Sequence, residues 1–222
     1  MKTAFVYLLV SQLTGSPLLA LAAIAVLWLS GGSWYLGRFP DVMAPFRRWS
    51  RERALRETLA ANPHDMTARS ELAGLIAERR PAEAKELLGE VLRRYPEQAL
   101  SHYFMGLAEL GLGNTEGGTR EIEAALAIRA DLRWGEPMLK LGDHLFEKGR
   151  FTEASAAYER ATQAHASHAQ AWFSAGRAAS KAGNGARARE FWQRTLTSTA
   201  GAPPFKRRQD RLWRWRAWLA LR

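Results

Sequence analysis

The stretch LGDHLFEKGRFTEASAAYERA, residues 141–161, decides the fold because its pattern recurs along the chain. The stretch has a helical composition, yet glycines and alanines stand in it at fixed places. Its two glycines, Gly142 and Gly149, have counterparts on both sides: Gly106 and Gly113 earlier in the chain, offset by 36 residues, and Gly176 and Gly183 later, offset by 34. A period near 34 residues predicts an array of helix-turn-helix units.

The larger residues follow the same register. The best copy of the pattern consists of Met138, Leu141, Gly142, Leu145, Gly149, Phe151, Ala154, Tyr158 and Ala161, and the next of Trp172, Ala175, Gly176, Ala179, Gly183, Ala188, Trp192 and Thr195. Over residues 46–200 the chain therefore resembles the tetratricopeptide repeat (TPR) family. The resemblance implies an all-α fold, an α-solenoid of about four hairpins at 66–95, 99–130, 135–166 and 169–199. A helix at 46–61 is expected to cap the first hairpin.

The small residues have a physical role in such an array. Gly142 and Ala154 are expected where the two helices of one hairpin cross, so that their backbones approach, and Tyr158 is expected to fill the next gap. Gly149 is expected to supply the positive φ angle that ends the first helix.

The N-terminal region predicts a membrane anchor. No charged residue occurs from Thr3 to Gly37, and Pro17–Leu36 is about 20 residues long, as a spanning helix requires. The alternative is a cleaved signal peptide with Lys2 as its basic start and Ala4–Val10 as its apolar core. The length of the apolar run favours a retained single-pass anchor in the inner membrane. Whether residues 4–13 belong to the span is left open.

The basic flank predicts the orientation. Residues 38–57 carry six arginines, against Lys2 and the amino terminus on the other side. The excess of Lys and Arg on the cytoplasmic side of membrane proteins places the repeat domain in the cytoplasm. A bacterial signal anchor with the domain outside is the alternative.

The charge distribution argues against nucleic-acid binding. The net charge is +10, yet residues 58–202 contain 18 basic and 18 acidic residues, so the excess lies outside the middle of the chain. A nucleic-acid groove more often spreads its basic residues over the folded body.

The sequence indicates neither an enzyme nor a cofactor or metal site. It lacks cysteine, which excludes a disulfide framework and a thiolate zinc site. His165 and His168 lie three residues apart without a clear third ligand. Gly111–Gly118 lacks the Gly-Lys-Ser/Thr ending of a phosphate-binding loop and reads as a repeat turn.

Residues 201–222 are basic and rich in tryptophan, and a helix is expected from about Phe205. One broad face of that helix would hold Arg207, Arg208, Arg211, Arg214, Trp215, Trp218 and Arg222. Three interpretations stay open: a capping helix with solvated arginines, a helix on an anionic lipid surface, and a binding segment for an acidic protein.

The TPR resemblance also implies a partner-binding groove lined by the first helix of each hairpin. Carried over position by position, its residues are Leu100, Tyr103, Phe104, Leu107, Leu139, Lys140, Asp143, Phe146, Phe173, Arg177 and Lys181. The Lys/Asn/Arg set with which some family members clamp a carboxyl terminus is absent, so an apolar segment of another protein is the expected ligand. The alternative is that Tyr103 and Phe104 pack against neighbouring hairpins.

The sequence thus predicts four segments: an anchor (1–37), a basic juxtamembrane segment with a capping helix (38–62), the TPR solenoid (63–200) and a basic, Trp-rich helix (201–222). The expected function is a membrane-anchored scaffold or adaptor that binds other proteins in a bacterial envelope-associated assembly. The alternative is a membrane-surface sensor whose tail binds anionic lipid.

Overall fold

The computed structural model describes residues 44–198, 200 and 203–222, together with Gln12, Gly15, Ser16, Leu18 and Leu21. The predicted span at 17–36 lies almost wholly outside these residues. Among the residues described, no helix combines the length and apolar character that crossing a membrane requires. The chain divides into two compact units, Met1–Phe46 and Arg47–Arg222, and the second contains the repeats.

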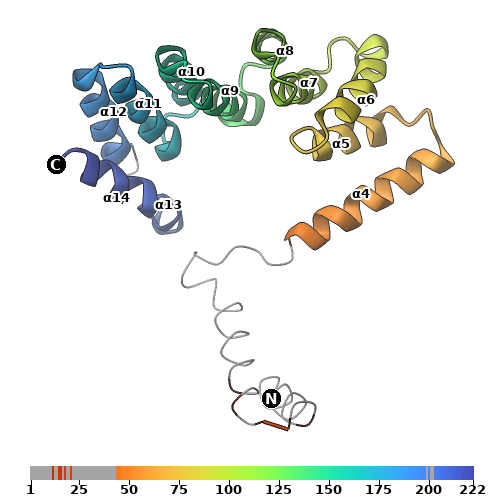
Figure 1. Ribbon diagram of the computed structural model, residues 1–222, viewed down its shortest axis with the longest axis horizontal. Helices are drawn as coiled ribbons and strands as arrows, with labels where there is room; N and C mark the ends of the chain where they lie inside the picture. Colours follow the sequence, from red (N-terminus) through yellow and green to blue (C-terminus); the bar gives the residue numbers. More distant parts are fainter. Residues whose placement is uncertain are drawn as a thin grey trace. The chain divides into compact units, whose positions relative to one another are not determined.

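The second unit is all-α, as predicted (Figure 1). Its helices are α4 (Ala44–Ala61), α5 (Met66–Ile76), α6 (Pro81–Arg94), α7 (Ala99–Gly111), α8 (Thr115–Ile128), α9 (Glu136–Glu147), α10 (Phe151–Ala164), α11 (Ala169–Lys181), α12 (Gly185–Thr197), α13 (Pro204–Gln209) and α14 (Arg211–Ala220), with a short turn, η1 (Leu132–Gly135), before α9. Helices α5 to α12 pack as four consecutive hairpins. Their bounds agree with the four hairpins predicted from the repeat.

Three of the four hairpins turn at a glycine with positive φ. The angles are 84° at Gly113, 75° at Gly149 and 83° at Gly183, so the predicted role of Gly149 is confirmed. In each case the glycine follows the first helix of the hairpin. The first hairpin has no such glycine, and there α6 begins with Pro81, whose fixed φ suits the first turn of a helix.

Gly149→Val is expected to lower the free energy of unfolding by ~1–2 kcal/mol, because a β-branched residue is strained in the left-handed region. A Cβ at this position would meet nothing within 4 Å, so the cost is one of backbone conformation and not of packing. Gly149→Asn, which tolerates this region better, is expected to cost less. Urea unfolding checks the order, and equal losses for the two variants would contradict it.

The glycines within α7, α9 and α11 make room for large side chains of the second helices. A Cβ on Gly142 would lie 2.7 Å from the ring of Tyr158, and one on Gly106 would lie 2.7 Å from Cγ1 of Ile122. Gly176 faces Trp192 in the same way. At Gly106 the added Cβ would also lie 3.0 Å from the carbonyl oxygen of Gly118, so there the two backbones come close, whereas the atoms nearest to a Cβ on Gly142 belong to the Tyr158 ring.

Helix α4 contacts the first hairpin at the N-terminal end of the solenoid. Its apolar contribution is small: Leu55 and Leu59 pack against the core. Three ion pairs also join α4 to the first hairpin: Arg51 pairs with Glu71 at 2.7 Å, Arg56 with Glu83 at 2.6 Å, and Arg80 with Glu52. Exposed pairs of this kind are each worth ~0–1 kcal/mol, so α4 is held by several weak contacts.

The C-terminal segment differs from the prediction of one helix. It forms two helices, α13 and α14, that meet at Asp210, where ψ is 0°. Asp210 is buried and its carboxylate lies 3.4 Å from Nζ of Lys206. Helix α14 packs on α11 and α12, where Ala217 is fully buried and the Trp213 ring lies 5.7 Å from that of Phe173 on α11. The break lets α14 cover the end of the solenoid, so the capping interpretation agrees with the fold.

One histidine ties stability to pH. His168 precedes α11, and its Nδ1 accepts a hydrogen bond from the backbone N–H of Ala171 at 3.4 Å. Burial lowers the pKa of His168, and the neighbouring His165 and Lys206 lower it further. When the pKa of a group is lower in the folded protein than in the unfolded chain, the group stabilises the fold above its unfolded pKa. This stabilisation is lost as the pH falls through the pKa of the folded protein.

The free energy of unfolding is therefore expected to fall as the pH drops below about 6.5. His168→Asn keeps a side-chain acceptor at the helix start and is expected to reduce this loss. Urea unfolding at a series of pH values measures it. An unchanged pH dependence in the variant would contradict the assignment.

Candidate functional site

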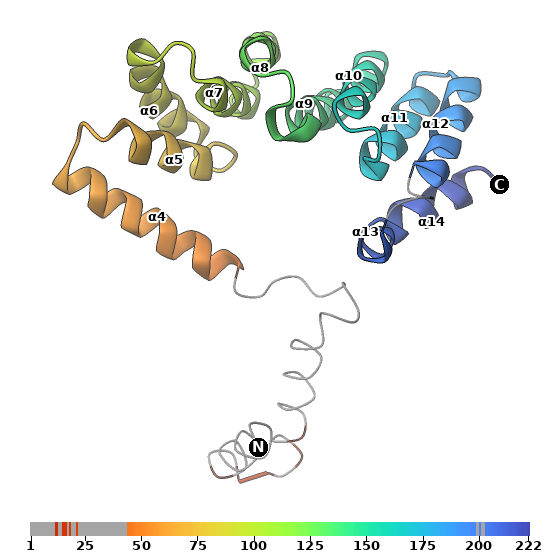
Figure 2. The same ribbon diagram turned by 180° about the vertical axis from the view of Figure 1, so that it is seen from behind.

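The first helices of the hairpins line one side of the row (Figure 2). Helices α5, α7 and α9 lie on its inner side, and α6, α8 and α10 lie outside. An ion pair shows how closely the inner side converges: Nζ of Lys140 on α9 donates to Glu78, which follows α5, at 2.5 Å across 62 residues of sequence. We call the side chains of Glu78, Leu107, Lys140, Asp143, Phe146, Arg177 and Lys181 the inner face.

Tyr103 links α7 to α9 beneath this face. The side chain is only 1% exposed, and its hydroxyl donates to Glu136 at 3.1 Å. Arg133 donates to the same carboxylate at 2.6 Å and lies 5.8 Å from the centre of the Tyr103 ring. Burial and the nearby Glu136 raise the pKa of Tyr103 far above its usual value, so the phenol stays a neutral donor. Tyr103 thus joins two hairpins.

Asp143 has a similar link within its own hairpin. The hydroxyl of Tyr158, a buried residue of α10, donates to its carboxylate at 2.7 Å. Burial raises the pKa of Asp143, although the hydrogen bond from Tyr158 and the charge of Lys140 oppose the shift. One carboxylate oxygen of Asp143 therefore already serves the packing of α9 on α10.

Arg177 and Phe146 form the part of the inner face best suited to a ligand. The guanidinium carbon of Arg177 lies 4.4 Å from the centre of the Phe146 ring, a cation–π contact between α11 and α9. Phe146 is held from behind by Phe151, with ring centres 5.2 Å apart. Among the described residues, no carboxylate lies within ion-pair distance of Arg177 or Lys181. This surface therefore combines the Phe146 ring with two cations, Arg177 and Lys181, that have no carboxylate partner among the described residues.

The structure separates the predicted groove residues into two groups. Arg177 and Lys181 are exposed, and Leu100, Leu107, Lys140, Asp143 and Phe146 are half-buried. Tyr103, Phe104, Leu139 and Phe173 are buried instead. Phe104 packs on Gly74 of the preceding hairpin, and the ring of Phe173 lies 5.7 Å from that of Trp213 on α14. These contacts agree with the alternative in which Tyr103 and Phe104 pack between hairpins.

The predicted tail residues separate as well. Arg207, Arg208, Arg211, Trp215 and Trp218 are exposed. Arg214 is half-buried, and its Nε is fully shielded from solvent. It lies on the side of α14 that also holds Trp213 and Ala217, and the membrane-surface role of these residues stays a prediction.

Trp134 is a candidate partner-binding residue that was not predicted from the sequence. It is 71% exposed in the turn before α9, where Arg133, Trp134 and Gly135 have positive φ angles of 46°, 50° and 87°. Such angles at two non-glycine residues are uncommon and cost energy. The signal was the offset of 36 residues, two more than the usual 34, between the second and third hairpins.

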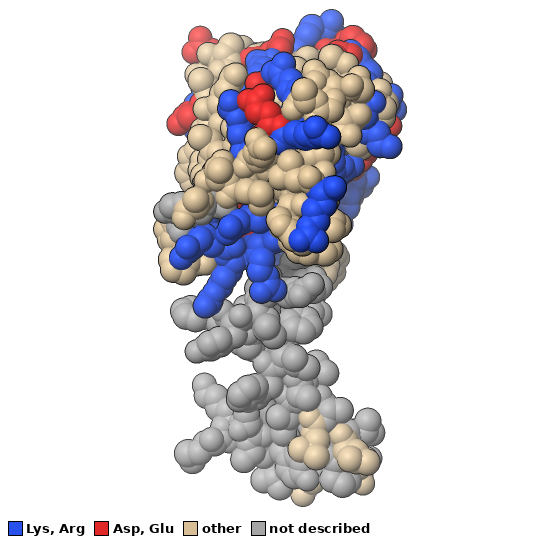
Figure 3. Space-filling view, turned by 90° about the vertical axis from the view of Figure 1, so that its left-hand side faces the viewer, with Lys and Arg blue, Asp and Glu red and all other residues tan. Residues whose placement is uncertain are grey.

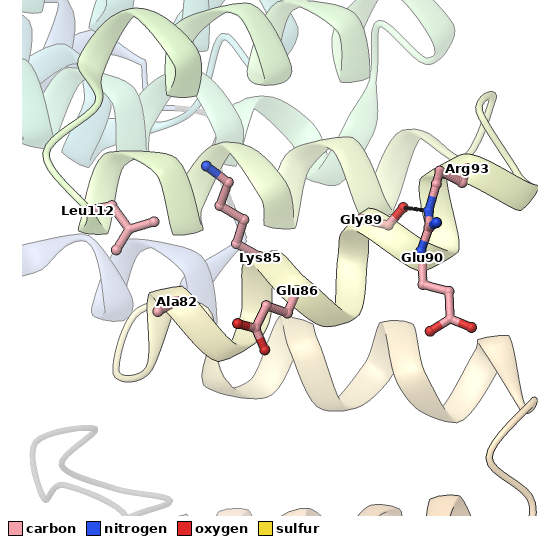
Figure 4. A pocket seen from close by; sticks show the side chains of 7 residues that line it. All are labelled: Ala82, Lys85, Glu86, Gly89, Glu90, Arg93 and Leu112. Carbon is pink, nitrogen blue, oxygen red and sulfur yellow. Dashed lines mark hydrogen bonds between the residues drawn. The ribbon is translucent and has the colours of Figure 1, made fainter.

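The structure also contains two surface hollows away from the inner face. The larger, of about 560 Å³, lies along the outer surface of α6 (Figure 4) and is lined by Ala82, Lys85, Glu86, Gly89, Glu90, Arg93 and Leu112. The other lies on α4, beside Trp49 and Arg53. The first is open and its Lys85 is already paired with Glu109 at 2.9 Å, which does not favour a small-molecule site. The described residues contain no cluster of His, Asp and Glu suited to a metal.

Comparison with known proteins identifies the class. The tetratricopeptide repeat family model matches residues 74–132 and 139–203, more than half of the chain. The chain therefore belongs to the TPR family, a class of helical repeat that serves as a protein-interaction scaffold rather than as an enzyme. No curated protein matches the sequence.

Several solved structures share the fold. The crystal structure of MamA is 20% identical, with a TM-score of 0.58, and the match covers 72% of this chain and 96% of that one. MamA from Desulfovibrio magneticus RS-1 is 17% identical, with a TM-score of 0.58 and coverages of 71% and 90%. YrrB, described as a TPR protein with an unusual peptide-binding site, is 19% identical, with a TM-score of 0.52 and coverages of 73% and 84%. Identities this low establish the fold alone.

Proposed function

We propose that this protein is a membrane-anchored scaffold whose inner face holds a segment of another protein. The observation that carries the proposal is the pairing of Phe146 with Arg177 on adjacent first helices, beside Lys181 and Lys140. An apolar side chain of a partner would lie on the Phe146 ring, and a neighbouring carboxylate would pair with Arg177 or Lys181. The partner segment is therefore mainly apolar, with an acidic residue beside its apolar anchor.

The anchoring part of the proposal rests on sequence. Pro17–Leu36 is uncharged and about 20 residues long, and six arginines follow it. A single span in the inner membrane, with the repeats on the cytoplasmic side, fits this distribution. The scaffold would then collect partners at the membrane as part of an envelope-associated assembly. The predicted lipid-binding role of residues 201–222 concerns another surface and does not compete with it.

Charge reversal of the inner face tests the binding role. Cross-linking and pull-down from membranes is compared for the wild type, for Lys140→Glu with Arg177→Glu, and for Arg93→Glu with Arg120→Glu on the second helices. The inner-face variant is expected to recover at least about tenfold less partner, since each lost buried charge contact costs more than about 1.4 kcal/mol. The second-helix variant is expected to match the wild type.

A further control separates binding from folding. Lys140→Glu also breaks the ion pair with Glu78, and Glu78→Lys in the same chain restores a pair of reversed polarity. Both proteins are expected to unfold near the wild-type temperature because the pair is partly exposed. Equal partner recovery from the inner-face variant and the wild type would contradict the proposed function.

Protease accessibility in sealed spheroplasts tests the orientation. The repeat domain is expected to resist protease added outside and to be digested after the membrane is opened. Digestion in intact spheroplasts would overturn the cytoplasmic placement and leave the binding proposal untouched.

A further inference from the structure

The outward side of α13 and α14 has an unusual composition for a surface facing water. Five large apolar side chains are exposed there: Phe205 (66%), Leu212 (46%), Trp215 (56%), Trp218 (40%) and Leu219 (52%). Five arginines are exposed among them: Arg207, Arg208, Arg211, Arg216 and Arg222. We call these ten side chains the tail surface.

The order of the residues on α14 explains how this surface arises. Asp210, Ala217 and the half-buried Trp213 and Arg214 turn towards the solenoid. Seven of the remaining positions, up to Arg222, form two exposed stripes at helical spacing. One consists of Arg211, Trp215, Trp218 and Arg222, and the other of Leu212, Arg216 and Leu219. Each stripe therefore carries both apolar and cationic groups.

The charge on the tail surface is of one sign. Residues 203–222 contain seven basic residues and a single acidic residue, Asp210, which is buried and lies beside Lys206. No ion pair joins the exposed arginines of α13 and α14 to any carboxylate among the described residues. Two of them lie on tryptophan rings instead: Arg216 is 5.1 Å from the centre of the Trp213 ring, and Arg222 is 3.5 Å from that of Trp218. Figure 3 shows Lys and Arg side chains gathered at this end of the second unit.

We propose that the tail surface docks on an anionic lipid bilayer. Tryptophan is enriched at the headgroup level, where its ring is buried and its N–H stays hydrated, and arginine beside it attracts anionic headgroups. A helix that mixes these residues with Leu and Phe on its exposed side has the composition of an interfacial helix. A bilayer neutralises arginines spread around two stripes without one-to-one pairing, whereas a folded acidic protein would have to match each position. The bilayer is therefore the better occupant.

The inference does not depend on the inner face or on its ligand. It adds a second membrane contact to the protein, at the opposite end of the solenoid from α4. Docking would hold the last hairpin close to the headgroups, because α14 packs directly on α11 and α12.

Fluorescence from a single site in the full chain tests the proposal. The protein lacks cysteine, so Ala220→Cys places one environment-sensitive dye beside the tail surface, and Ala127→Cys places it on α8 as a control. The labelled chains are studied in vesicles of phosphatidylcholine alone, or with about a third phosphatidylglycerol, with brominated acyl chains as quenchers. The dye at position 220 is expected to shift to the blue and to be quenched in anionic vesicles, with a smaller response at high salt. The dye at 127 is expected to show neither change.

Two double variants divide the contributions. Arg208→Glu with Arg211→Glu is expected to weaken the fluorescence response to anionic vesicles by at least about tenfold. Trp215→Ala with Trp218→Ala is expected to reduce quenching by the brominated acyl chains, while the preference for anionic over neutral vesicles remains. Arg93→Glu with Arg120→Glu is the matched charge control and is expected to respond like the wild type. Circular dichroism checks that all variants fold, since every changed side chain is exposed.

An equal response in neutral and anionic vesicles, or no response at position 220, would overturn the proposal. A response to soluble poly-glutamate without any response to anionic vesicles would overturn it in favour of an acidic protein partner. Partner recovery through the inner face is unaffected by any of these outcomes.

Discussion

Gly142→Leu is expected to lower the free energy of unfolding by ~1–3 kcal/mol, because it overfills the contact between α9 and α10. Even the Cβ of the new side chain would lie 2.7 Å from the Tyr158 ring. That ring cannot move outwards at low cost, since Tyr158 is 3% exposed and its hydroxyl is bound to Asp143 at 2.7 Å. The hairpin must therefore open or lose the hydrogen bond.

Gly89→Leu is the matched control for this prediction. Gly89 also lies within a helix, α6, but a Cβ there would meet nothing within 4 Å. Leucine is the better helix former, so this variant is expected to be unchanged or more stable by up to ~1 kcal/mol. Urea unfolding of both variants gives the comparison. A loss of the same size at both positions would mean that helix propensity, and not the Tyr158 contact, explains Gly142.

Phe191→Ala is expected to have the larger effect, a loss of ~3–5 kcal/mol, because it leaves a cavity in the last hairpin. Phe191 is 1% exposed, and its ring centre lies 5.8 Å from that of Trp172. The Nε1–H of Trp172 donates to the carbonyl of Ala166 at 2.8 Å, which limits the movement of Trp172 into the space left behind. The α11–α12 hairpin is therefore expected to loosen.

Hydrogen exchange locates the effect of Phe191→Ala. Because each repeat contacts mainly its neighbours, the amides of α11 and α12 are expected to lose protection well before those of α7 and α8. Phe205→Ala, at a position that is 66% exposed, is expected to stay within about 0.5 kcal/mol of the wild type. A uniform loss of protection along the row would contradict a local role for Phe191.

The repeat itself was predictable from sequence because it depends on residues with few alternatives. Glycine suits the positive φ angles at the hairpin turns best, and at Gly142 and Gly106 even a Cβ would lie 2.7 Å from Tyr158 or Ile122. These requirements recur in three successive hairpins, so the period shows them directly. The bounds of the four hairpins followed from that period.

The binding surface was harder to predict because a repeat position does not fix what covers it. Phe173 occupies a groove position by register, yet α14 packs on it through Trp213. The break at Asp210 and the inward turn of Arg214 depend on that packing and leave no period in the sequence. Phe191 likewise stands beside the repeating Trp192 and carries no signal of its own.

The central claim is that partners bind the inner face, and cross-linking from single positions tests it most directly. A photoreactive residue is placed at Leu107 or Lys181 on the first helices, or at Ala127 or Arg93 on the second helices, in the full chain in native membranes. One partner is expected to cross-link strongly from Leu107 and Lys181 and not from Ala127 or Arg93. Cross-linking of that partner from Ala127 or Arg93, with none from Leu107 or Lys181, would contradict it.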